Sequence, residues 1–250
     1  MHVHQPLAIG SRLGANRLCS PVVSNDKIAL VQRYPMFLDI PATDCTAILV
    51  CAHERHFSRR QVIFLAGDPI RHTLLLTSGT VKVTQSGQNG GEVILRLNGE
   101  GESVGALGMC TRGEHCASVK ALENCTALLW DASTFETLAE RYPILRRNLI
   151  RILEIRLQEI DARFREISTE KVSARLSSEI LRLVDQIGKR TEGHVDISLS
   201  REELAQLTGT TLFTVSRLLC QWELQGIVST RREGVVVRNI EALIELSQQE

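Results

Sequence analysis

Short apolar runs separated by glycine-containing turns occupy the first half of the chain. They lie at 62–65, 72–76, 80–84, 93–97, 119–122 and 127–130, with turns at 66–69, 78–79 and 87–91. Short strands punctuated in this way are typical of an all-β barrel or a double-sheet jelly roll. A short helix is expected just before them, near 42–53.

The pattern changes at Pro143, a residue type that often stands at the first position of a helix. From there to 168, apolar residues are spaced alternately three and four apart, which predicts a parallel coiled coil between two copies of the chain. The residues of this seam are Ile150, Leu153, Leu157, Ile160, Phe164 and Ile167. A second stripe is expected to pack on the chain's own first domain: Leu145, Leu149, Ile152 and Ile155. A single helix buried in a monomer is the alternative, but charged residues between the stripes favour the dimer.

The segment 201–220 has the pattern of a helix-turn-helix, in which two helices cross at a steep angle. Such a unit needs a small residue where the helices nearly touch, and Ala205 meets this need. It also needs a turn residue that tolerates positive φ, which Gly209 supplies. Val215 and Leu218 fill the gap between the helices. An ordinary helical hairpin is the alternative, but several independent demands are met together.

Capping residues mark where the two helices start. Ser200 and Glu203 have the spacing of a capping box for the first helix, and Thr210 or Thr211 can cap the second. The recognition helix is then 212–225.

A β-hairpin is predicted after this unit. Gly226 ends the second helix, and apolar runs at 227–230 and 235–238 flank a basic turn at 231–234. A short strand at 195–199 precedes the first helix. Strand, two helices and hairpin make a winged helix, whose hairpin can reach the phosphate backbone of DNA.

Composition and charge neither support nor exclude this interpretation. The chain has 250 residues, 43% of them hydrophobic, and its 29 Lys and Arg balance 29 Asp and Glu. Ten basic and twelve acidic residues lie within 169–250, so the case for DNA binding depends on where the arginines lie. No apolar run approaches the ~20 residues of a membrane span, and 1–27 contains no apolar signal core. We therefore expect a cytoplasmic protein without membrane contact.

The sequence contains none of the common enzyme motifs. It has no His-Glu-x-x-His, no Gly-x-x-x-x-Gly-Lys and no supported Ser/His/Asp arrangement, so we expect no enzymatic activity. Seven cysteines without a Cys-x-x-Cys pair favour buried free thiols. Cys110, Cys116 and Cys125 lie close to His115 in sequence, which leaves a redox or metal site open without predicting a metal.

A β-roll, a long dimer helix and a winged helix in this order resemble the Crp/Fnr family of bacterial transcription regulators, over about 34–245. The matching motifs are 34–37 (Tyr-Pro-Met-Phe), 67–68 (Gly-Asp), 78–79 (Ser-Gly), 101–107 (Gly-Glu-Ser-Val-Gly-Ala-Leu) and, most specifically, 214–217 (Thr-Val-Ser-Arg). The resemblance implies that the β-roll senses a small signal and that the helix transmits it. The winged helices of a homodimer would then bind a palindromic promoter site and contact RNA polymerase.

The resemblance also implies an α+β organisation in four parts. These are an unassigned N-terminal extension (1–33), a jelly-roll-like β-roll sensor domain (34–138), a dimerisation helix (139–168) and a winged helix-turn-helix DNA-binding domain (169–250).

The predicted effector pocket departs from the members that bind cyclic AMP. Those members hold the ribose hydroxyl with a glutamate where this chain has Ala106. They hold the phosphate with an arginine-serine pair, at the positions of His115 and Cys116 here. A buried phosphate needs a charged partner such as arginine, so the sequence argues against cyclic AMP. The residues predicted for the pocket are Gly105, Ala106, Leu107, His115 and Cys116.

Other cofactors of the family are judged from the cysteines and histidines. Oxygen-sensing members bind an iron–sulfur cluster through closely spaced N-terminal cysteines, whereas only Cys19 precedes residue 34 here, so this cluster is not expected. Haem is left open by the cysteines and by His53, His56, His72 and His115.

The recognition helix supplies the predicted base contacts, which are Arg217, Ser216, Phe213 and Leu212. Arg217 can bind guanine in a bidentate manner. Phe213 stands where many members have a glutamate, and it can pack on a thymine methyl or on the preceding helix. Phosphate contacts are expected from Ser200, Arg201, Thr210, Thr211, Arg231 and Arg232. The predicted function is a dimeric DNA-binding regulator. The alternatives are an effector-free DNA binder and a cyclic-nucleotide-binding-like interaction module that does not read DNA.

Overall fold

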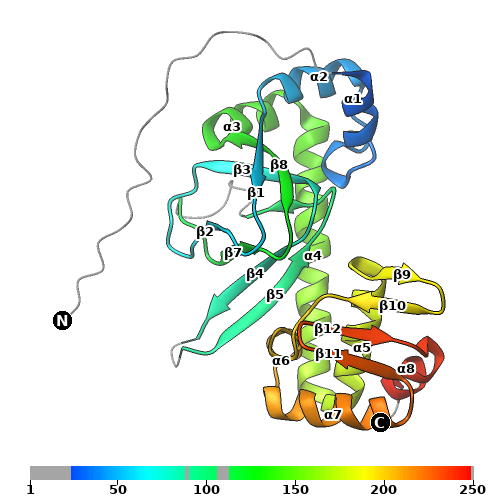
Figure 1. Ribbon diagram of the computed structural model, residues 1–250. Helices are drawn as coiled ribbons and strands as arrows, with labels where there is room; N and C mark the ends of the chain where they lie inside the picture. Colours follow the sequence, from blue (N-terminus) through cyan, green and yellow to red (C-terminus); the bar gives the residue numbers. More distant parts are fainter. Residues whose placement is uncertain (1–23, 88–89, 106–112, 249–250) are drawn as a thin grey trace.

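The computed structural model describes residues 24–87, 90–105 and 113–248 (Figure 1). Within these residues the first domain forms two antiparallel four-stranded sheets, in the orders β1-β8-β3-β6 and β2-β7-β4-β5. The strands are β1 (His53–Phe57), β2 (Val62–Phe64), β3 (His72–Ser78), β4 (Val81–Ser86), β5 (Glu92–Asn98), β6 (Ser103–Val104), β7 (Ser118–Ala121) and β8 (Cys125–Asp131). The predicted double-sheet β-roll is confirmed.

The predicted helix near 42–53 is too long at its C-terminal end. Helix α2 (Ala42–Val50) ends at Val50, and His53 already pairs with Leu129 of β8. Strand β1 was not predicted because only Phe57, its last residue, is buried, so it lacks an alternating apolar pattern. Pairing with β8 decides its conformation.

Helices cover one end of the β-roll (Figure 1). They are α1 (Asn25–Val31), the 3-10 helix η1 (Pro35–Phe37), α2 and α3 (Ala132–Arg141). Their shared core contains Trp130, whose indole N–H donates a hydrogen bond to the Ile48 carbonyl at 2.8 Å. Ile28 and Val31 of α1 lie in the same core, although 1–33 has no assignment from the sequence.

Helix α4 (Pro143–Thr169) starts at the predicted proline and runs from the β-roll to the C-terminal domain (Figure 1). Leu145 and Leu149 are buried against the first domain, and Ile152 is partly buried there. Ile155 was expected in this stripe but is 45% exposed, so that part of the prediction is wrong. It lines a hollow together with Pro35, Gly101 and Ser103 of the first domain, so it faces that domain without being buried by it.

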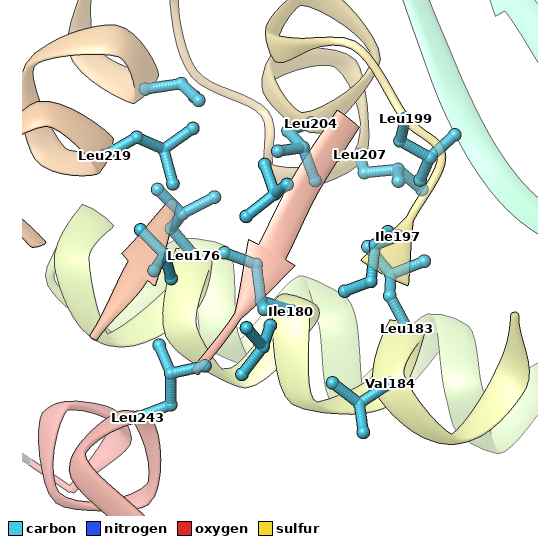
Figure 2. Packing of buried hydrophobic residues seen from close by; sticks show 14 of the residues in the cluster. Leu176, Ile180, Leu183, Val184, Ile197, Leu199, Leu204, Leu207, Leu219 and Leu243 are labelled. Atoms are coloured by element: carbon cyan, nitrogen blue, oxygen red, sulfur yellow. The ribbon is translucent and has the colours of Figure 1, made fainter. Parts of the chain in front are cut away.

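The C-terminal domain is a winged helix. Its sheet has the order β11-β12-β10-β9. The elements are α5 (Val172–Gln186), β9 (Lys189–Thr191), β10 (His194–Ile197), α6 (Arg201–Thr208), α7 (Leu212–Leu224), β11 (Val228–Arg231), β12 (Gly234–Val237) and α8 (Ile240–Ser247). Figure 2 shows the core, in which Leu176 and Ile180 of α5 lie with Leu204 of α6 and Leu219 of α7.

Three elements of this domain were missed. Helix α5 buries Leu176, Ile180 and Leu183 in the domain core. Strand β9 is exposed throughout and forms by pairing with β10. Helix α8 buries Leu243 fully among the residues of the domain core.

Two side chains of the β-roll belong to the core of the C-terminal domain. Ile94 and Leu97 of β5 are 1% and 3% exposed, and both pack in the cluster that contains α5, α6 and α7. The winged helix is therefore docked on the β4–β5 hairpin of its own chain.

Candidate nucleic-acid interface

The first helix of the pair begins with a complete capping box. The Ser200 hydroxyl accepts a hydrogen bond from the Glu203 N–H at 3.2 Å, and the Ser200 N–H donates to the Glu203 carboxylate at 3.0 Å. The helix ends at Gly209, whose φ of 62° is left-handed. These local interactions confirm the predicted start and turn of the helix-turn-helix.

The recognition helix α7 is capped by Thr211, whose hydroxyl accepts from the Thr214 N–H at 3.2 Å. Of the two candidate caps, Thr211 therefore holds the position, and Thr210 uses its N–H to donate to the Ala205 carbonyl. The buried face of α7 consists of Val215, Leu218, Leu219 and Trp222.

The predicted base-contacting residues lie on the open face of α7. Phe213 is 78% exposed and Leu212 is 49% exposed, so Phe213 does not pack on the preceding helix. Arg217 is exposed and Ser216 is half-buried. Figure 1 shows α7 at the end of the molecule that points away from the β-roll. The structure thus brings all four predicted base-contacting residues to one free helix.

The wing is a tight hairpin in which Arg231 pairs with Gly234. Arg231 and Arg232 are exposed, as a phosphate contact requires, although Arg231 is also 3.1 Å from Asp196. The tip is not purely basic, because Glu233 lies there too and forms ion pairs with the β-roll.

Arg201 is half-buried and ties the first helix to the wing. Its guanidinium donates to the Thr230 hydroxyl at 2.9 Å. The same Thr230 donates its N–H and its hydroxyl to the Glu223 carboxylate, and these two hydrogen bonds lower the pKa of Glu223. The end of the recognition helix and the wing are therefore held as one unit.

The predicted effector pocket is only partly described, since Ala106 and Leu107 lie outside the described residues. His115 is buried and stacks on Phe64, with ring centroids 3.6 Å apart. Burial lowers the pKa of His115, so its imidazole is favoured in the neutral form. A Cβ at Gly105 would come within 3.0 Å of the Phe64 ring. Cys116 is exposed and does not share the buried position of His115.

The cysteines and histidines do not gather into a site in the part of the chain that the structure describes. No group of three or more His, Cys, Asp or Glu residues there could hold a metal ion. Cys45 and Cys125 are buried, Cys51 is half-buried and Cys220 is exposed. Cys19 and Cys110 lie outside the described residues. His56 contacts the Thr126 hydroxyl at 3.0 Å and His72 is 3.4 Å from Asp131, whereas His53 is exposed on β1.

The sequence did not reveal the contacts between the winged helix and the β-roll. Lys82 of β4 forms an ion pair with Glu203 at 3.1 Å, and Arg59 and Arg60 form ion pairs with Glu233 at 2.9 and 2.7 Å. The partners are 121 to 174 residues apart in the chain, so no local pattern could have indicated them.

Comparison with known proteins agrees with this arrangement. Residues 54–142 match the model of the cyclic nucleotide-binding domain, and residues 174–246 match that of the Crp-like helix-turn-helix domain. The chain belongs to the Crp/Fnr family of regulators. Crp/Fnr-type regulators of transcription bind DNA, and this chain carries both of their domains in the family order.

The chain covers most of the length of the relatives and solved structures that it resembles. It is 29% identical over 214 residues to the cyclic AMP receptor protein of Thermus thermophilus, which covers 85% of this chain and 96% of the relative. It is 23% identical over 202 residues to the fumarate and nitrate reduction regulatory protein of Escherichia coli, covering 79% and 80%. The c-di-GMP-responsive regulator CLP of Xanthomonas campestris has the same fold, with a TM-score of 0.70 at 21% identity, covering 79% of this chain and 99% of that chain. Among the described helices, none is long and apolar enough to cross a membrane.

Proposed function

We propose that this Crp/Fnr chain is a homodimeric regulator that reads a palindromic promoter site through α7 and contacts RNA polymerase. The observation that carries the proposal is the free face of α7, where Arg217 and the 78%-exposed Phe213 stand beside a capped helix start. An exposed phenylalanine at the front of a recognition helix suits contact with a thymine methyl. Arg217 suits bidentate binding to guanine.

The exposed seam of α4 supports the homodimer. Its residues range from 45% exposed at Leu153 to 72% at Phe164, although their spacing matches a heptad. A row of this kind is costly in water, and a second copy of α4 would cover it. A twofold dimer would place two copies of α7 on half-sites about one helical turn of DNA apart.

The phosphate contacts are assigned to helix starts and to the wing. Thr211 at the start of α7 is exposed, and so are Arg231 and Arg232. Ser200, Arg201 and Thr210 are only partly exposed, and the first two already have partners within the domain. We therefore assign the main phosphate contacts to the wing and to Thr211, with smaller contributions from the other three.

Selection from a random pool of double-stranded DNA, followed by binding of Arg217→Ala, tests this function. Removal of a bidentate arginine should cost about 1–3 kcal/mol and relax the preference at one base pair in each half-site. Unchanged specificity in the variant would place Arg217 outside the major groove. Equal binding of selected and random DNA by the unaltered protein would contradict the function itself.

A second candidate is a DNA binder that works without an effector, and the packing around His115 favours it. The position where relatives of the cyclic AMP type need an arginine holds the imidazole of His115, which stacks on Phe64 and whose pKa is lowered by burial. A buried phosphate would find no charge-assisted donor at His115, so the described residues do not fit a cyclic nucleotide bound in the usual manner. The absorbance spectrum and metal content of the purified protein would reveal haem, and calorimetry with cyclic AMP should show no heat. Heat of binding would overturn this second candidate.

A further inference from the structure

The wing of the C-terminal domain is clasped by the β-roll of the same chain. The Glu233 carboxylate at the wing tip is 2.9 Å from Arg59 and 2.7 Å from Arg60, which follow β1. These arginines lower the pKa of Glu233 and keep it ionised. Arg59 is itself held, because its Nε donates to the Leu122 carbonyl and its backbone N–H donates to the Asn124 side chain at 2.9 Å. The two ion pairs of Glu233 with Arg59 and Arg60, here called the clasp, therefore join the wing tip to a fixed turn of the β-roll.

A second ion pair lies deeper in the same interface. Lys82 and Glu203 are 12% and 20% exposed, with 3.1 Å between Nζ and the carboxylate. Burial alone would raise the pKa of Glu203, but the Ser200 N–H and Lys82 outweigh it and lower the pKa. Glu203 thus serves the capping box of α6 and the contact with the β-roll at once.

These contacts determine which face of the winged helix is free. Ile94 and Leu97 of β5 occupy the domain core beside α6, and the two ion pairs lie on the same side. Helix α7 lies on the opposite side, pointing away from the β-roll (Figure 1). Contacts with the β-roll therefore leave the recognition helix open instead of covering it.

We propose that Glu233 is a positioning residue for DNA recognition, which holds the wing on the Arg59–Arg60 turn and so keeps α7 in an orientation open to DNA. The proposal rests on the proposed function. It assigns a favourable role in DNA binding to an acidic residue that, by its charge alone, would repel phosphate.

Reversing the charge at position 233 distinguishes a positioning role of Glu233 from direct electrostatic repulsion between Glu233 and the DNA phosphates. Glu233→Arg places a third positive charge beside Arg59 and Arg60, which breaks the clasp but makes the wing tip more basic. Positioning predicts that its affinity for selected DNA falls about threefold to fivefold at low salt, the range of an exposed ion pair, while its affinity for random DNA does not fall. Direct electrostatics predicts tighter binding to both.

The rescue variant is Arg60→Glu combined with Glu233→Arg, which restores an attractive pair, and it should recover the selectivity. Glu192→Arg is the matched control, because it makes the same change in the exposed turn between β9 and β10, where Glu192 forms no ion pair with any of the described residues. It should retain the selectivity of the unaltered protein. Circular dichroism would show that all variants are folded.

Tighter or unchanged binding of selected DNA by Glu233→Arg would overturn the proposal, as would failure of the double variant to recover selectivity. These results differ from failure of the proposed function, in which the unaltered protein itself would not prefer selected DNA.

Discussion

Truncation of one residue in the heptad seam of α4 should raise the dissociation constant of the proposed dimer by a factor that can be estimated from the structure. Leu157 is 60% exposed in the single chain, and complete burial of a leucine contributes about 1.5–3 kcal/mol. Covering the exposed part would thus contribute roughly 1–2 kcal/mol in each protomer, and the twofold symmetry doubles it to about 2–4 kcal/mol. Leu157→Ala should therefore raise the dimer dissociation constant about thirtyfold to several-hundredfold.

Sedimentation over a dilution series measures this constant directly. Leu224→Ala is the matched control, because Leu224 is 91% exposed but lies at the end of α7, away from the seam. The control should dissociate at the same concentration as the unaltered protein. If Leu157→Ala did so as well, or if the unaltered chain were monomeric, the seam would have no role in assembly.

Three further predictions concern single residues. Arg232→Ala should weaken binding to all DNA sequences and reduce the slope of log K against log salt by about 0.9 for each phosphate that the arginine neutralises in the unaltered protein; an unchanged slope would remove the wing from the interface. Gly209→Ala should destabilise the fold by about 1–2 kcal/mol, because φ there is 62°, a conformation that strains an alanine. A steric clash does not contribute, since the nearest atom to the added Cβ, on Ile167, is at an ordinary 3.6 Å. As a control, Gly91→Ala lies at an open position without positive φ and should not change the melting temperature. The folded protein should lose stability as the pH falls below 6.5, because burial lowers the pKa of His115 and the unfolded chain then binds the proton more readily. The melting temperature of His115→Phe should depend less on pH, and an identical dependence would refute the assignment to His115.

Local sequence was sufficient to predict the helix-turn-helix. The capping box of Ser200 and Glu203, the cap at Thr211 and the left-handed turn at Gly209 all depend on residues three or four apart. The start of α4 at Pro143 is equally local. Both partners of each such interaction lie within one short segment, so the sequence predicts the interaction without knowledge of the fold.

The sequence could not predict elements that form only through distant partners. Strand β1 has four exposed residues and becomes a strand by pairing with β8, about 70 residues away. The effector pocket was placed from a resemblance, and within it the structure buries His115 but exposes the adjacent Cys116. Neither result follows from spacing, because each depends on the distant residues that the segment meets in the folded chain.

Periodicity and capping are local properties of the chain, and for this reason its order of residues was enough to specify a β-roll, a long helix and a winged helix. The docking of the winged helix on the β-roll, in contrast, is visible only in the folded molecule. Ile94 and Leu97 fill a core formed by residues about 100 positions later, and Glu233 reaches Arg59 across 174 residues. Such contacts depend on shape and charge brought together by the whole fold, and they leave α7 free.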